Sequence, residues 1–227
     1  MKKHPVLSNN AERTKQIAVT ALLAALAFAA TAIPFFKIPV VPAAPYLKFD
    51  PKDVFIVLGG FIVGPLASVF ISVSVSVIEM FTLSSTGLIG LAMNVIASCA
   101  FAVPAAYIYK KRRDLAGAVI GLAAGSLFTC AVMLLWNWLM VPLYTPGLTR
   151  AATAKMLIPV FLPFNVFKTA VNSCLTLLLY RPVIAAFRRA GLVKGSSGGK
   201  KRLVVPLLVA VAAVLALCAA LWFLLNR

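Results

Sequence analysis

The sequence predicts an all-α integral membrane protein, and three observations carry this prediction. Hydrophobic residues make up 62% of the 227 residues and charged residues only 12%, whereas soluble domains average about 25% charged residues. The mean hydropathy is +1.00. Apolar runs long enough for an α-helix to cross a bilayer, about 20 residues, recur along the chain. This composition excludes soluble, disordered and fibrous proteins.

The first apolar run covers residues 17–36 and follows a polar tail at residues 1–14. It is too long for the apolar core of a cleavable signal peptide, which spans roughly 7–15 residues. Pro39, Pro42 and Pro45 come next, and each proline fixes φ and removes a backbone donor. We therefore expect a first membrane span followed by an extended loop.

A second apolar stretch, residues 54–83, contains the break signal Gly64-Pro65. A proline that follows a glycine is typical of one helix ending and another beginning. We expect two short helices, over residues 51–64 and 65–81. Asp50 is the expected cap of the first helix, because a carboxylate can accept hydrogen bonds from the free amides of a first turn.

Three further spans are predicted in the central part of the chain. Two prolines, Pro159 and Pro163, interrupt the last of them, so we expect its regular helix to begin near Pro163. The runs cover residues 87–109, 115–143 and 156–180.

The C-terminal part differs in composition. Residues 191–202 form a basic Gly/Ser linker, which predicts flexibility. Residues 203–227 contain an uninterrupted apolar run and predict an extra transmembrane helix. The expected organisation is a six-helix bundle over residues 15–190, followed by this linker and this additional C-terminal helix.

The strong positive charge is explained by membrane topology. Twenty-two Lys and Arg residues face five acidic residues, for a net charge of +17. Cytoplasmic loops of membrane proteins are enriched in basic residues, and the anionic lipid of that leaflet attracts them. A cytoplasmic N-terminus places most of the basic clusters on one side if residues 54–83 cross an even number of times or form a re-entrant hairpin. No nucleic-acid partner is needed to explain the charge. The clusters on that side are Lys2, Lys3, Arg13 and Lys15; Lys110 to Arg113; Arg181, Arg188, Arg189 and Lys194; and Lys200 to Arg202.

Catalytic motifs are missing from the chain. His4 is the single histidine, and the cysteines lie in apolar runs without the spacing of metal ligands. The chain has no Gly-x-x-x-x-Gly-Lys-Ser/Thr phosphate loop and no Gly-x-Ser-x-Gly motif. We therefore expect no enzyme, no metal and no cofactor, but a binding subunit that takes its energy from a partner.

The informative residues are polar groups inside apolar runs, because an ionisable group in the membrane costs at least about 2.5 kcal/mol and needs a partner or a function. In the predicted topology these groups lie in the outer half of the bundle and converge on one outward-facing pocket. Asn165 and Lys168 are three residues apart and share a helix face. Two other readings stay open, an ion pair between Glu79 and Lys168, and amides that only join helices. The candidate ligand-binding residues are Asn165, Lys168, Asn137, Asn94 and Glu79.

The first span also offers a small-residue face. Ala21, Ala25 and Ala29 recur every four residues, and such spacing lets helices approach closely. Either a partner protein or internal packing would satisfy this pattern.

At this point the chain resembles a known family, the S components of energy-coupling factor (ECF) transporters, specifically the riboflavin-binding type. The resemblance covers roughly residues 14–190 and rests on four local patterns. They are the Ala-rich segment at residues 20–27; Leu-Lys-Phe-Asp-Pro-Lys-Asp at 47–53 followed by Gly-Gly-Phe-Ile-Val-Gly-Pro at 59–65; Ser-Thr-Gly-Leu-Ile-Gly-Leu-Ala-Met-Asn at 85–94; and Pro-Phe-Asn-Val-Phe-Lys-Thr-Ala-Val-Asn at 163–172.

The resemblance implies a six-helix protein that captures riboflavin from outside and works with a T component and two cytoplasmic ATPases. It implies that Asn165 and Lys168 bind the polar edge of the isoalloxazine, with Asn137 as a further ligand contact. Ala21 and Ala25 correspond to the face that contacts the T component. The seventh span departs from the family pattern. The alternatives are an S component for another vitamin, such as thiamine or folate, and a stand-alone secondary carrier.

Overall fold

The computed structural model describes residues 5–33, 38–39, 47–84, 86–145 and 147–192. Most of the predicted linker and the whole predicted seventh span lie outside the described residues. Pro42 and Pro45 of the expected extended loop lie outside them as well.

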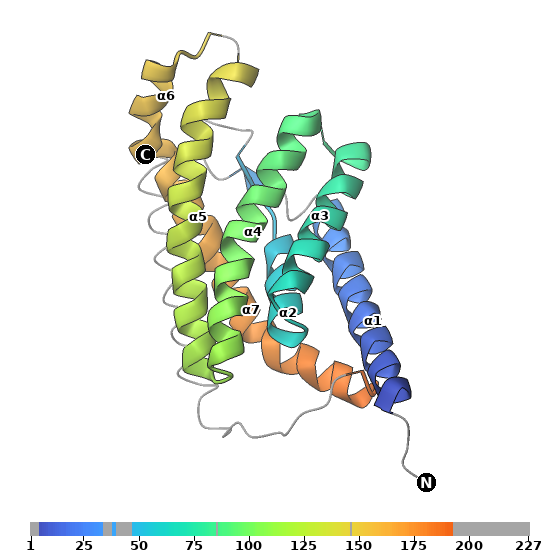
Figure 1. The fold of residues 1–227 in the computed structure, drawn as a ribbon. Helices are drawn as coiled ribbons and strands as arrows, with labels where there is room; N and C mark the ends of the chain where they lie inside the picture. The colour runs from blue at the N-terminus through green and yellow to red at the C-terminus, as the bar shows by residue number, and fades with distance from the viewer. Residues whose placement is uncertain (1–4, 34–37, 40–46, 85, 146, 193–227) are drawn as a thin grey trace.

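The described chain is a bundle of helices with one short β-ribbon (Figure 1). The two strands pair antiparallel, with Ile38 opposite Phe49 and Pro39 opposite Lys48. In chain order the elements are α1 (Pro5–Ala32), β1 (Ile38–Pro39), β2 (Lys48–Phe49), α2 (Lys52–Ile62), α3 (Pro65–Thr82), α4 (Gly87–Lys111), α5 (Leu115–Tyr144), α6 (Arg150–Met156), the π-helical turn η2 (Leu157–Phe161) and α7 (Leu162–Arg189).

Within the described residues, five helical segments are long and apolar enough to cross a membrane, which confirms the predicted class of multi-pass α-helical membrane protein. They cover Asn10–Ala32, Pro65–Thr82, Gly87–Lys111, Leu115–Leu143 and Arg150–Arg189. The other helix of the predicted bundle, α2, has only 11 residues. At 1.5 Å per residue it is only about 16 Å long, too short to cross a bilayer alone.

The predicted break at Gly64-Pro65 is confirmed. Gly64 has φ 138°, a conformation that residues with a Cβ rarely adopt, and Pro65 begins α3. The expected cap of α2 is wrong, because Pro51 occupies the cap position with no side-chain hydrogen bond. Asp50 instead directs a carboxylate oxygen to Lys168, 3.5 Å away, since a buried cation is a stronger partner than a neutral amide.

The last predicted span has a different shape from the one expected. Helix begins earlier, at Arg150, and continues through η2 into α7. Pro159 lies inside η2, and Pro163 lies in the first turn of α7. The wider π turn accommodates prolines that lack the amide for a regular helical hydrogen bond. Regular α-helix resumes at Leu162, close to the predicted start.

Helices α4 and α5 pack at short distance because two glycines of α5 face α4. A Cβ at Gly121 would lie 2.6 Å from the Ala105 carbonyl oxygen, and one at Gly125 would clash with the Phe101 carbonyl oxygen. Glycines four residues apart allow such close helix contact in membranes. This contact fixes one wall of the cleft described below.

The basic clusters, as far as the structure describes them, gather at one end of the bundle. The start of α1, the turn between α4 and α5 and the end of α7 lie at the same end in Figure 1, away from the β-ribbon. At this end the Lys15 amino group donates to the Gly191 carbonyl, 2.7 Å away, and so joins α1 to the end of α7. The fold therefore separates a basic end from the half that holds the polar site.

Candidate functional site

A cleft of about 610 Å³, its opening included, lies between β2, the start of α2, α4, α5 and α7. Apolar side chains such as Phe101, Met133 and Phe164 form much of its wall. Four of the five predicted ligand-binding residues line it: Asn94, Asn137, Asn165 and Lys168. The fold thus brings together side chains from three helices, as the sequence predicted.

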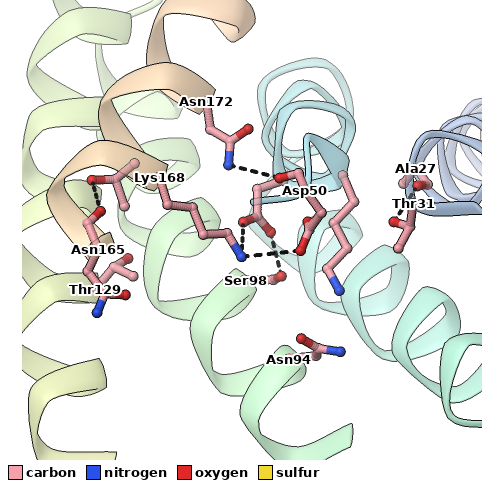
Figure 2. A network of polar contacts seen from close by, with 12 residues as sticks. Ala27, Thr31, Asp50, Asn94, Ser98, Thr129, Asn165, Lys168 and Asn172 are labelled. Carbon is pink, nitrogen blue, oxygen red and sulfur yellow. Dashed lines mark hydrogen bonds and ion pairs between the residues drawn. The ribbon is translucent and has the colours of Figure 1, made fainter. Parts of the chain in front are cut away.

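A buried group of charges forms the polar side of the cleft. The Lys168 amino group lies 3.5 Å from Asp50 Oδ2 and 3.4 Å from Asp53 Oδ2, and its side chain is 13% exposed. The Ser98 hydroxyl donates to Asp53 Oδ1. Figure 2 shows Lys168 reaching from its helix toward Asp50, with Ser98 beside them. Lysine 168 is therefore held between two carboxylates at the cleft wall.

The ionisation of Asp50 follows from these neighbours. Burial raises the pKa of this carboxyl, but the positive charges of Lys168 and Lys52 together outweigh burial and hold the pKa below its ordinary value. Asp50 Oδ1 is buried and has no hydrogen-bond partner among the described residues. Asp50 lines the cleft, and one of its carboxylate oxygens thus has acceptor capacity that the described residues do not use.

A second ion pair lies behind the cleft wall. The Lys52 amino group is 2.6 Å from Glu79 Oε2, and the two side chains are 2% and 4% exposed. Asn94 Nδ2 donates to the same oxygen at 3.0 Å. The ion pair that the sequence allowed between Glu79 and Lys168 is not formed, because each of them pairs with another residue. Glu79 is not among the described residues that line the cleft, so its contact with ligand stays a prediction.

Asn137 of α5 and Asn165 of α7 each direct the side-chain nitrogen to a backbone carbonyl one turn earlier in the chain. Asn137 Nδ2 donates to the Met133 carbonyl, and Asn165 Nδ2 to the Phe161 carbonyl, each at 2.7 Å. Asn137 Oδ1 is buried without a donor among the described residues. A buried acceptor without a partner is uncommon in folded proteins. Asn137 lines the cleft, and this oxygen can accept a hydrogen bond from an N–H or O–H group.

Asn172 lies beside the cleft and holds the loop before α2. Its Nδ2 lies 3.5 Å from the Asp50 backbone carbonyl oxygen, at the outer limit of a hydrogen bond. This contact agrees with the reading of Asn172 as an amide that joins segments.

The contribution of residues 50–53 to the site did not follow from the candidate residues of the sequence. Asp50 was expected only as a helix cap, and Lys52 and Asp53 were not among the candidates, yet Lys52 is 1% exposed and Asp53 3%. One signal was available, since three of only five acidic residues in the chain, Asp50, Asp53 and Glu79, lie in or next to apolar segments. A chain so poor in acids seldom places them near a membrane without a partner. Among the described residues, no group of three or more His, Cys, Asp and Glu is arranged to hold a metal ion.

The small-residue face of α1 points away from the bundle. Ala21 and Ala25 are exposed, whereas Leu23 and Ala27 on the other side of the helix are fully buried. Internal packing against the described residues therefore does not account for the alanine spacing.

Comparison with known proteins agrees with this architecture. Residues 15–180 match the family model described as "ECF transporter, substrate-specific component". The chain is 29% identical over 185 residues to the riboflavin transporter RibU of Staphylococcus aureus (strain TCH60), with 79% of this chain and 96% of that protein covered. It is 28% identical over 176 residues to the riboflavin transporter FmnP of Bacillus subtilis (strain 168), covering 74% and 91%.

A solved structure gives the same result at the level of the fold. It is described as "Structure and mechanism of the S component of a bacterial ECF transporter" and superposes with a TM-score of 0.63 at 28% identity. The alignment covers 77% of this chain and 98% of that one. The family model spans most of the chain and describes membrane transport components, not enzymes. This chain therefore belongs to the substrate-specific components (S components) of ECF transporters.

Proposed function

We propose that this S component captures riboflavin from outside the cell for ATP-driven uptake. Two relatives that align over more than nine-tenths of their length are named riboflavin transporters. The observation that carries the proposal is the cleft itself, where a buried lysine and unpaired acceptors face apolar walls.

The chemistry of riboflavin fits this arrangement. The isoalloxazine has an apolar dimethylbenzene end, which suits a wall containing Phe101, Met133 and Phe164. Its pyrimidine edge carries carbonyl acceptors for the Lys168 ammonium, and its ribityl chain and imide supply donors for Asp50 Oδ1 and Asn137 Oδ1. The cleft lining combines apolar side chains with a few polar anchors, as small-molecule sites usually do.

Purified protein provides the test. We expect flavin absorbance bands in the purified sample, or saturable quenching of riboflavin fluorescence on titration. Thiamine and folate added in excess should not displace riboflavin. A protein that binds no riboflavin but binds thiamine or folate would assign it to another vitamin.

We further propose that Ala21 and Ala25 form the docking face for the T component, which in turn joins two ATPases. Both alanines are exposed on α1, and small side chains allow a partner helix to approach closely. Riboflavin uptake should require the T component and the ATPases. Uptake by the S component alone in liposomes would instead support a stand-alone carrier.

The orientation and the C-terminal segment complete the proposal. The described basic residues at one end of the bundle support a cytoplasmic N-terminus, which a reporter fused before Met1 tests directly. Residues 203–227 are proposed as a peripheral anchor, so a chain truncated at Gly195 should still bind riboflavin.

A further inference from the structure

The Lys52–Glu79 pair has no role in the binding chemistry described so far. It is one of the most deeply buried polar contacts among the described residues, with the Lys52 and Glu79 side chains 2% and 4% exposed. Neither residue is among those that line the cleft. A buried ion pair adds little net stability compared with apolar residues of the same size. The contact that this pair makes with a cleft residue therefore points to a role other than stability.

That contact is with Asn94, whose amide has two chemically different ends. The nitrogen donates hydrogen bonds and the oxygen accepts them. Glu79, as the ion-pair partner of Lys52, is a carboxylate and has acceptors only. Asn94 Nδ2 lies 3.0 Å from Glu79 Oε2, and the reverse orientation would place the amide oxygen against the carboxylate oxygen. The carboxylate therefore dictates which end of the amide faces it.

The other end of the amide faces the cleft. Asn94 lines the cleft, and in Figure 2 its oxygen points to the side where Ser98 and Lys168 lie. None of the described residues donates a hydrogen bond to this oxygen. Asn94 thus presents an acceptor to the cleft.

We propose that Glu79 is a positioning residue, which holds Asn94 with its carbonyl oxygen toward the ligand and so makes the site select a ligand with an N–H or O–H donor at that point. Lys52 compensates the buried charge of Glu79 and joins the start of α2 to α3. Asp50 and Asp53 of the same short segment hold the Lys168 ammonium. Residues 50–53 therefore position both the cation of the site, Lys168, and its acceptor, Asn94. This inference rests on the proposed function, because its ligand is riboflavin.

Glu79→Gln tests the orientation, because a glutamine amide can accept from Asn94 or donate to it. Binding is measured for three flavins: riboflavin, 3-methylriboflavin, which lacks the imide donor, and lumiflavin, which lacks the ribityl hydroxyls. Wild-type protein should prefer riboflavin over both analogues. One of the two analogues lacks the donor that faces Asn94. In Glu79→Gln the preference for riboflavin over that analogue should fall about fivefold, since a neutral hydrogen bond is worth about that factor.

Two more variants separate orientation from general damage. Asn94→Leu should lose the same preference, and Glu79→Gln should change it no further in that background, as expected for residues that act through one contact. Ser76→Ala is the matched control, because Ser76 lies one turn before Glu79 on α3 and is 1% exposed. It should leave all three affinities unchanged. If Glu79→Gln does not fold, the double variant Lys52→Met with Glu79→Gln, which removes both charges, is measured in its place.

The outcomes are distinct. Equal weakening of all three flavins in Glu79→Gln, with the preferences intact, would make Glu79 merely structural and overturn the inference. Unchanged preferences in Asn94→Leu would overturn it as well. Wild-type protein that binds none of the flavins would overturn the riboflavin assignment and this inference together.

Discussion

Replacement of Lys168 by alanine addresses the proposed site most directly. The lysine side chain is 13% exposed and its amino group lies within 3.5 Å of two carboxylates. The substitution removes one charged hydrogen bond to the ligand, worth about 1.5–3 kcal/mol. We therefore expect the Kd for riboflavin to rise about tenfold to 150-fold.

The same substitution also disturbs the empty protein. Without Lys168, the carboxylates of Asp50 and Asp53 lose their shared cation, and breaking a buried pair costs up to about 3–5 kcal/mol of stability. Lys168→Ala combined with Asp53→Asn removes one of the two stranded charges and leaves the proposed Asp50 acceptor in place. This double variant should recover part of the thermal stability but not the affinity, which separates a ligand contact from a scaffold effect.

Fluorescence quenching of riboflavin by the purified protein measures the affinity, and thermal unfolding in the same detergent measures the stability. Lys155→Ala is the control, because Lys155 is an exposed lysine of the short helix α6. It should leave both readouts unchanged. If Lys168→Ala binds riboflavin with wild-type affinity, the assignment of Lys168 as a ligand donor is wrong.

Three further tests address the packing, the charges and the partner face. Gly60→Ala should destabilise the protein by about 1–3 kcal/mol in thermal unfolding, because the new Cβ would lie 2.6 Å from Ala106 Cβ. Gly59→Ala should destabilise it less, since the atom that the new Cβ meets is the movable end of a side chain. Equal losses of stability in the two variants would contradict this packing. The pKa of Asp50 is lowered in the folded protein, so the Asp50 carboxylate stabilises the fold. This stabilisation of the fold is fully present above the ordinary pKa of 3.8 and is lost as the pH falls through the lowered pKa of the folded protein. The melting temperature of the wild type should thus fall more steeply in acid than that of Asp50→Asn, and parallel curves would refute the charge argument. Ala25→Trp should abolish co-purification with the T component while riboflavin affinity is kept, and intact co-purification would exclude this face.

Local sequence patterns predicted the membrane class and several element boundaries correctly. Hydropathy indicates a span wherever an apolar run is long enough, because the bilayer imposes the same length on every crossing helix. Gly64-Pro65 predicted a break because backbone conformation there depends only on the two residues. The spacing of Asn165 and Lys168 also predicted a shared helix face, since residues three apart lie on one side of a helix, and both residues line the cleft.

Local pattern was a poorer guide to the last helix. The π turn at Leu157–Phe161 was concealed because prolines signal an interruption without showing how the chain accommodates it.

The partners of the charged residues were decided only by the tertiary structure. The sequence showed that Glu79 and Lys168 needed partners and offered each other as the simplest pair. The fold instead joins Glu79 to Lys52 and Lys168 to Asp50 and Asp53. The physical reason is that hydropathy places a residue at a depth in the membrane, whereas the partner of a buried charge depends on which helices pack side by side and on how each is rotated. The short helix α2 brings residues 50–53 into the bundle, and this arrangement builds the site.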